Sequence, residues 1–172
     1  LAVLREHADS LASLLSPEQG TGLPVSPEVR PDFQTENGVL YQGDCLDVLP
    51  ALPASSVDLA FADPPFNLKK LYPSGIDDDL REDEYLRWCE DWIEEVIRLL
   101  KPGGSLLLWN LPKWNSALCG YLNDRLTFRH WIAVDIKYSL PIKGRLYPSH
   151  YSLLYYCKDT KPAAFNPDRL AM

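Results

Sequence analysis

A short loop of five residues, Asp63, Pro64, Pro65, Phe66 and Asn67, contains side chains and backbone groups that could hold an amino group. Two successive prolines fix two φ angles and remove two backbone N–H donors, so the turn is rigid and its carbonyl oxygens are free to accept hydrogen bonds. The Asp63 carboxylate and the Pro64 carbonyl can each accept one N–H of an amino group, while Phe66 offers a flat face for a planar base. Held in this way, the amino nitrogen would turn its lone pair toward an electrophilic methyl group.

The same residues also have a plain structural interpretation. A Pro-Pro turn with an aspartate that makes a local hydrogen bond is common in loops. The position of the loop favours chemistry, because it directly follows the apolar run 57–62, and ligands of α/β proteins gather at the carboxyl ends of strands. We therefore treat the loop as a candidate catalytic site.

The rest of the chain alternates strand-like and helix-like stretches. The clearest helix has Leu86, Cys89, Ile93, Val96 and Leu100 on one face and ends at Lys-Pro-Gly-Gly. Short apolar strands separated by helices predict an α/β fold of the Rossmann-like kind, with a mostly parallel sheet of about five strands and helices on both faces. The predicted strands are 39–41, 57–62, 105–109, 128–138 and 151–157, and the predicted helices are 45–52, 82–100 and 113–123.

Four parts of the chain differ in composition. Residues 1–15 place leucines at helical spacing and predict an appended helix. Residues 16–38 are rich in proline, a composition that opposes both helix and strand, and predict a linker. The α/β domain follows over 39–158, with a loop at 139–149, and 159–172 form an irregular tail.

The overall composition limits the classes of protein. A chain of 172 residues with 46% hydrophobic residues can bury a core. A net charge of −7 argues against a large basic surface on this chain. Without an apolar run of about 20 residues or a signal peptide, we expect a soluble, cytoplasmic protein. The four cysteines form no CxxC pair, so we expect buried free thiols and no metal site.

Between Leu40 and Lys158 the chain resembles the N-terminal catalytic portion of the beta-class DNA methyltransferases, which modify adenine N6 or cytosine N4. The resemblance rests on Gly43-Asp44-Cys45-Leu46, on the strand and Asp-Pro-Pro-Phe-Asn loop from Ser56 to Asn67, and on the helix end and strand from Leu100 to Leu107. The strand after His150 is also similar, except that Tyr151 stands where glutamate is usual in that family.

The resemblance implies roles for individual residues. It makes S-adenosylmethionine the methyl donor and double-stranded DNA with a flipped target base the substrate. The Asp-Pro-Pro-Phe loop (Asp63, Pro64, Pro65 and Phe66) would be catalytic, with Asp63 and Pro64 holding the amino group and Phe66 stacking on the base. Asp44 and Cys45 would lie near the cofactor, together with Asp63. Substrate contacts are assigned to Asn67 and Lys69, which could equally be solvated loop residues, and to Arg145 and His150, which could equally be structural.

The sequence departs from the family in one respect. A Phe-x-Gly-x-Gly loop, where a glycine-rich turn lets the backbone approach the cofactor, has no match here. Three explanations stay open: the chain is a fragment, another chain completes it, or it is a relative that no longer methylates. We favour the first. An incomplete sheet would leave an edge strand unpaired, so we expect as partner a missing C-terminal portion, a second subunit or a homodimer mate.

Three functions compete. We favour a site-specific adenine-N6 DNA methyltransferase, as in bacterial or phage restriction-modification, because the loop begins with aspartate and the cytosine-N4 branch more often has serine there. The alternatives are an amino-methyltransferase that acts on RNA or a small molecule, and a non-catalytic module that has the fold without the cofactor loop.

Overall fold

The structure is a computed structural model that describes residues 29–71, 78–136, 143–144 and 150–166. The chain forms two compact units, Leu1–Pro53 and Ala54–Met172, which are described separately. The helix predicted at 1–15 lies outside the described residues.

The first unit contains a small hairpin followed by a helical turn. Strands β1 (Phe33–Thr35) and β2 (Gly38–Leu40) pair in antiparallel fashion. The expected irregular linker is therefore wrong at 33–35, because pairing with β2 satisfies the backbone there. The helix predicted at 45–52 divides into α2 (Cys45–Val48) and the 3-10 turn η2 (Leu49–Ala51), since Pro50 lacks the N–H that would continue an α-helix.

The second unit contains a four-stranded sheet in the order β3-β4-β6-β5. Strand β3 (Val57–Ala62) pairs in parallel with β4 (Leu100–Asn110), and α3 (Glu82–Leu99) connects them. Strand β6 (His150–Cys157) is antiparallel both to β4 and to β5 (Thr127–Asp135). The predicted mostly parallel sheet is therefore wrong, although the α/β class is confirmed.

The mixed sheet results from the insertion of β6. Strands β4 and β5 run in the same direction and are connected by α4 (Pro112–Asn123). A connection of this kind would normally place parallel strands side by side. Here β6 returns between them and pairs with both. The sheet has four strands and not about five, because the strand expected at 39–41 is part of the separate hairpin.

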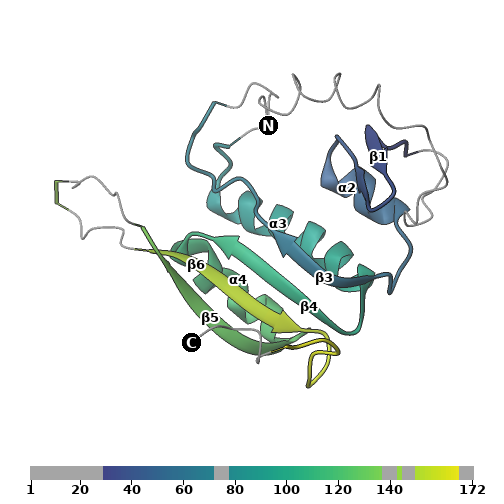
Figure 1. The fold of residues 1–172 in the computed structure, drawn as a ribbon. Coiled ribbons are helices and arrows are strands. Elements are labelled where there is room, and N and C mark those ends of the chain that lie inside the picture. Colours follow the sequence, from purple (N-terminus) through teal and green to yellow (C-terminus); the bar gives the residue numbers. More distant parts are fainter. Residues whose placement is uncertain (1–28, 72–77, 137–142, 145–149, 167–172) are drawn as a thin grey trace. The chain divides into compact units, whose positions relative to one another are not determined.

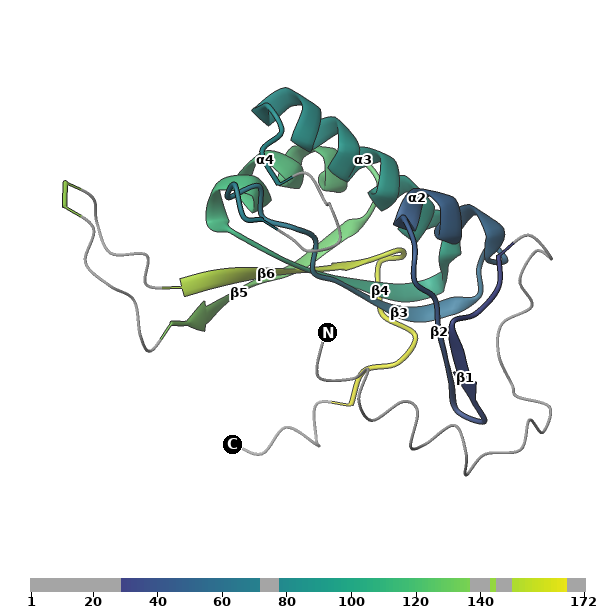
Figure 2. The ribbon, with the colours of Figure 1, turned by 90° about the horizontal axis from the view of Figure 1, so that it is seen from above.

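The two faces of this sheet differ. Helices α3 and α4 lie on the same face (Figures 1 and 2). That face carries the fully buried Leu106, Leu108 and Leu154. On the opposite face, Leu59 and Phe61 of β3 have relative accessibilities of 56% and 59%. We had expected helices on both faces of the sheet. In the part of the second unit that the structure describes, helices cover only one face (Figures 1 and 2).

The Lys-Pro-Gly-Gly segment after α3 extends β4 and contacts the tail. Strand β4 begins at Leu100 and includes these residues, whereas we had expected a helix through residue 100 and a strand only from 105. Gly103 has φ +71°, and a Cβ atom at this position would lie 2.8 Å from Ala163. The Ala163 N–H also donates to the Gly103 carbonyl (2.9 Å). A glycine is therefore required for both backbone conformation and space.

Other features expected from the composition can be compared with the structure. All four cysteines are free thiols; Cys89 and Cys157 are buried, and the other two are half-buried. Among the described residues no helix is long and apolar enough to cross a membrane. Within the same residues no group of three or more His, Cys, Asp or Glu side chains could hold a metal ion.

Candidate active site

The Asp-Pro-Pro-Phe loop lies directly after the carboxyl end of β3, as predicted. Strand β3 is fixed there by its parallel pairing with β4, which continues to the partners Ala62 and Leu108. Asp63 is exposed, while Pro64, Pro65 and Phe66 are half-buried. A strand that ends next to a parallel neighbour thus presents a rigid turn at the edge where α/β proteins bind ligands.

Two aromatic side chains from the covering helices hold the loop. The Tyr85 hydroxyl of α3 donates to the Pro65 carbonyl oxygen (2.7 Å), and the indole N–H of Trp114 in α4 donates to the Phe66 carbonyl oxygen (2.7 Å). The two aromatic rings also pack together, with centroids 4.6 Å apart. The two helices therefore fix consecutive carbonyl groups of the same turn.

Asn110, at the end of β4, determines the direction of the Tyr85 hydrogen bond. Its side-chain amide donates to the Tyr85 oxygen (3.1 Å), and both residues are buried. Because an amide nitrogen can only donate, the hydroxyl proton of Tyr85 is directed to Pro65. Burial raises the pKa of Tyr85 far above its ordinary value, so the hydroxyl keeps this proton.

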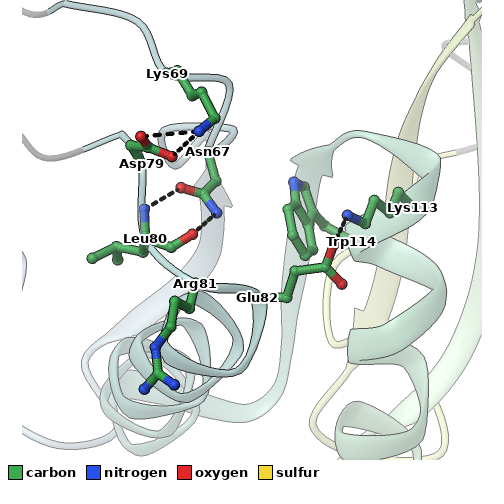
Figure 3. A pocket seen from close by; sticks show the side chains of 8 residues that line it. All are labelled: Asn67, Lys69, Asp79, Leu80, Arg81, Glu82, Lys113 and Trp114. Atoms are coloured by element: carbon green, nitrogen blue, oxygen red, sulfur yellow. Dashed lines mark hydrogen bonds and ion pairs between the residues drawn. The ribbon is translucent and has the colours of Figure 1, made fainter.

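A buried carboxylate holds the far end of the loop. Asp78, only 3% exposed, accepts backbone N–H groups from Asn67 (2.8 Å), Leu68 (3.0 Å) and Lys70 (2.9 Å). The Asn67 side chain exchanges two hydrogen bonds, both 2.8 Å, with the Leu80 backbone (Figure 3). Asn67 has φ +55°, a conformation that asparagine tolerates. Its amide therefore helps to hold the loop, while contact of Asn67 with a substrate stays a prediction.

Phe66 belongs to a row of aromatic rings that also includes Tyr151 and Trp109. The Phe66 and Tyr151 centroids are 5.8 Å apart, and those of Tyr151 and Trp109 are 5.3 Å apart. Tyr151, which stands where the related family usually has glutamate, thus supports the ring expected to stack on a base. Tilted pairs at such distances are favourable arrangements of aromatic rings.

Asp63 differs from the rest of the loop because its carboxylate takes no part in fixing the loop to the surrounding described residues. Neither this carboxylate nor the Pro64 carbonyl accepts a hydrogen bond from the residues that the structure describes. Partial desolvation raises the pKa of the Asp63 carboxyl above its ordinary value. The described residues therefore leave available the two acceptors that an amino group needs.

Two of the expected cofactor residues lie in the first unit. Asp44 caps α2, with its Oδ1 accepting the Leu46 N–H (2.9 Å). Cys45 is half-buried, and burial together with the nearby Asp44 charge raises its thiol pKa. The third expected residue, Asp63, lies in the second unit. Asp44 is exposed, and its second carboxylate oxygen suits a hydroxyl or ammonium group.

Three further substrate residues were predicted, namely Lys69, His150 and Arg145. Lys69 is exposed and forms an ion pair with Asp79 (2.8 Å). His150 begins β6 and is paired in register with Asp135 of β5. Arg145 lies outside the described residues.

A hollow of about 390 Å³ lies beside the loop (Figure 3). Its cations are paired with acids: Lys69 with Asp79, Lys113 with Glu82, and Arg81 with Glu84. The hollow thus presents charges of both signs. Its lining consists of Asn67, Lys69, Asp79, Leu80, Arg81, Glu82, Lys113 and Trp114.

Sequence reasoning missed the residues that hold the loop, namely Tyr85, Trp114, Asn110 and Asp78. Tyr85 lies on the buried face of a helix that the sequence predicts, where an aromatic residue indicates only a core position. Asp78 lies in a stretch of three aspartates, which usually form a solvated surface. No local signal distinguishes these residues, because their partners lie 8 to 48 positions away in the chain.

Comparison with known proteins identifies related enzymes. The model of the DNA methylase family N6_N4_Mtase matches residues 57–172. The Type II methyltransferase M.BamHI of Bacillus amyloliquefaciens is 53% identical over 145 residues, which is 84% of this chain and 34% of that protein. The chain thus spans about a third of the length of this relative.

Two solved structures share the fold. The PvuII DNA methyltransferase, described as cytosine-N4-specific, matches with a TM-score of 0.67 and 22% identity over 83% of this chain and 57% of that one. M1.HpyAVI, solved in complex with SAM, matches with a TM-score of 0.53 and 17% identity over 77% of this chain and 60% of that one.

Proposed function

Because this chain belongs to the N6_N4_Mtase family of DNA methylases, we propose that it carries the target-amine site of an S-adenosylmethionine-dependent DNA methyltransferase. The observation that carries the proposal is the pair of free acceptors in an otherwise fixed loop. Asp63 and the Pro64 carbonyl have no donor among the described residues, whereas the Pro65 and Phe66 carbonyls are occupied. An exocyclic amino group has two N–H donors and matches this pair.

The two acceptors would activate the amino nitrogen. When both N–H groups are held, the nitrogen lone pair is directed out of the plane of the base and away from conjugation with the ring. When bound, S-adenosylmethionine would supply an electrophilic methyl group to this nitrogen, and the surplus proton of the methylated amine would pass to the Asp63 carboxylate or to water. Asp63 and Pro64 orient the nucleophile, and Asp44 is our candidate for binding the cofactor.

We propose adenine N6 as the methylated atom. The aspartate at the start of the loop supports adenine, as argued from the sequence. Cytosine N4 is the second candidate, because the PvuII enzyme, whose fold is similar, is described as cytosine-N4-specific. Both bases present an amino group on a planar ring, so the pair of acceptors fits either one. Mass spectrometry of nucleosides from methylated DNA distinguishes N6-methyladenine from N4-methylcytosine.

We propose that the base reaches this loop by leaving the duplex, with Phe66 stacking on it. A base inside a duplex cannot reach a turn of this kind, so enzymes that modify bases flip them into a pocket. The Phe66 ring, supported by Tyr151, offers such a surface. Binding to duplex DNA, with little binding to RNA, would separate this function from the RNA and small-molecule alternatives. The setting we expect is modification of DNA in the cytoplasm of a bacterium.

We further propose that additional protein covers the free side of the sheet. Among the described residues β3 pairs only with β4, and the strand exposes Leu59 and Phe61. A parallel sheet edge with exposed apolar side chains is suited to a further strand and layer. The remainder of the protein, a second subunit or a copy of this chain could supply it.

The central experiment compares Asp63→Ala with the starting protein in methyl transfer from labelled S-adenosylmethionine to DNA. We expect a loss of about 10²–10³-fold, the size seen when one group that stabilises a transition state is removed. Asp58→Ala is the matched control, since Asp58 lies on β3, the strand that leads into the loop, and pairs at the surface with Lys101 (2.8 Å). Full activity of Asp63→Ala would overturn the proposal.

Calorimetric titration with S-adenosylmethionine tests the non-catalytic alternative. Micromolar binding supports an active site that holds the cofactor. A folded chain that does not bind the cofactor would mean that the cofactor loop lies in missing sequence or in a partner, or that the module has lost catalysis.

A further inference from the structure

We propose that Tyr85 and Trp114 are positioning residues that determine which backbone carbonyl receives the target amino group. This inference rests on the proposed function. Neither side chain has to touch the substrate for this role. They act through the loop, by occupying the two carbonyls that could compete with Pro64 and by fixing the plane of the turn.

The loop requires help of this kind because of its own sequence. Pro64 and Pro65 have no N–H, so the turn cannot be held by donors of its own at these positions. Its carbonyl oxygens are the groups by which the surrounding protein can fix it. The Pro65 and Phe66 carbonyls accept hydrogen bonds of 2.7 Å from Tyr85 and Trp114. The described residues thus leave for a ligand the Pro64 carbonyl together with the Asp63 carboxylate.

The two donors form one buried structure. Tyr85 is 2% exposed and Trp114 is 4% exposed, and their rings are in contact. Asn110, fully buried at the end of β4, donates to the Tyr85 oxygen. A chain of hydrogen bonds therefore runs from the sheet through α3 to Pro65. Because each group is desolvated, loss of one partner leaves another buried group unsatisfied.

Removing either donor should impair orientation more than binding. In Tyr85→Phe the Pro65 carbonyl is released and can rotate toward the amine, so the substrate has a second, unproductive acceptor. Trp114→Phe does the same for Phe66. A small misplacement of a reacting group can reduce the rate by about 10²-fold. We therefore expect a fall in kcat of about 10–100-fold, with little change in the KM for DNA or in the Kd for the cofactor.

The chain supplies matched control variants. Tyr121→Phe removes a hydroxyl that bonds to Glu94 of α3 (2.6 Å) and does not reach the loop. Trp92→Phe removes an equally buried indole, 4% exposed, whose N–H has no partner among the described residues. These variants should keep kcat near that of the starting protein, although Trp92→Phe also loses some packing.

Two readouts test the inference. Steady-state methylation assays give kcat and KM for the four variants, and circular dichroism checks that each variant is folded. Nuclear magnetic resonance, independent of activity, follows solvent exchange of the Trp114 indole proton and the carbonyl carbon shift of Pro65. We expect a protected indole proton in the starting protein and a Pro65 carbonyl shift that changes in Tyr85→Phe but not in Tyr121→Phe.

The outcomes separate the two proposals. If the starting protein methylates DNA and the Tyr85 and Trp114 variants retain the kcat of their controls, the positioning role is wrong. A fall only in DNA affinity also contradicts it. If the starting protein methylates nothing, the proposed function fails, and the nuclear magnetic resonance measurement decides whether the two donors hold the loop: a rapidly exchanging indole proton and an unchanged Pro65 shift would overturn that too.

Discussion

The two faces of the four-stranded sheet differ in how far other parts of the described chain cover them. On the helix-covered face, Leu106, Leu108 and Leu154 are fully buried, and the helices supply the donors that fix the candidate catalytic loop. On the open face, β3 leaves Leu59 and Phe61 more than half exposed. Helices on the covered face therefore fix the geometry of the loop, whereas the opposite face, with its exposed apolar side chains, is suited to receive further protein.

The largest effect should come from the covered face. Leu154→Ala deletes a fully buried side chain of the central strand β6, and we expect it to lower the free energy of unfolding by about 2–5 kcal/mol. The neighbouring Leu153→Ala, a half-buried position on the open face, should cost clearly less. Denaturant titration measures both. Equal losses would show that the two faces are equally packed.

The loop anchor should give the next largest effect. Asp78→Ala leaves three backbone N–H groups of the loop without their carboxylate partner. We expect a loss of about 1–3 kcal/mol and faster amide hydrogen exchange at Asn67, Leu68 and Lys70. Exposed Asp79 offers a control, since Asp79→Ala removes a surface ion pair of small energetic value. If amide hydrogen exchange in the loop is unchanged in Asp78→Ala, Asp78 does not anchor the loop.

The pH dependence of methyl transfer should reveal the state of Asp63. Desolvation raises the pKa of Asp63, and only the ionised carboxylate can accept an N–H with both oxygens. Activity should therefore fall by about tenfold per pH unit below the raised pKa and level off above it. Asp63→Asn, whose amide oxygen accepts without titrating, should lack this fall.

The same pKa shift has a consequence for stability. A raised pKa means that the folded protein binds this proton more tightly than the unfolded chain, so ionisation of Asp63 opposes folding once the pH exceeds the raised value. Asp63→Asn should therefore be no less stable than the starting protein at neutral pH. A loss of stability in this variant would indicate a structural role for the charge.

The open face should give the smallest effect. Phe61→Thr removes an exposed ring while keeping a residue that favours strands, and we expect a change in unfolding free energy within about 0.5 kcal/mol. Phe61→Thr should instead weaken the binding of the additional protein that we propose to cover this face. Light scattering or sedimentation measures that association. A loss above about 2 kcal/mol would indicate that the ring is already packed.

Local patterns predicted the helices and strands well. The buried face of α3, the apolar run of β3 and the loop that follows it are all where the sequence indicated. The sheet directions were not predictable in this way, because β6 has the same apolar pattern whether it runs parallel or antiparallel to β4. The hairpin strand β1 was missed because its three residues are defined by pairing and not by composition.

The candidate site could be predicted only in part. The residues that would touch the substrate are adjacent in the chain, so Asp63, Pro64 and Phe66 form a recognisable motif. The residues that orient them are not adjacent. Tyr85 and Trp114 look like ordinary core aromatics, and only the folded structure brings their polar atoms to the loop. Sequence reasoning therefore found the motif and missed its support.

The insertion of β6 between β4 and β5 has a consequence for the order of folding. During synthesis β4 and β5 leave the ribosome before β6, yet neither can pair with the other across a gap the width of one strand, about 10 Å between their axes. Strand β5 can therefore join the sheet only after β6 has been synthesised. We expect β5 and β6 to pair first and then to dock on β4, so that bringing together these two strands, which are separated in the chain, is the slow step that completes the sheet.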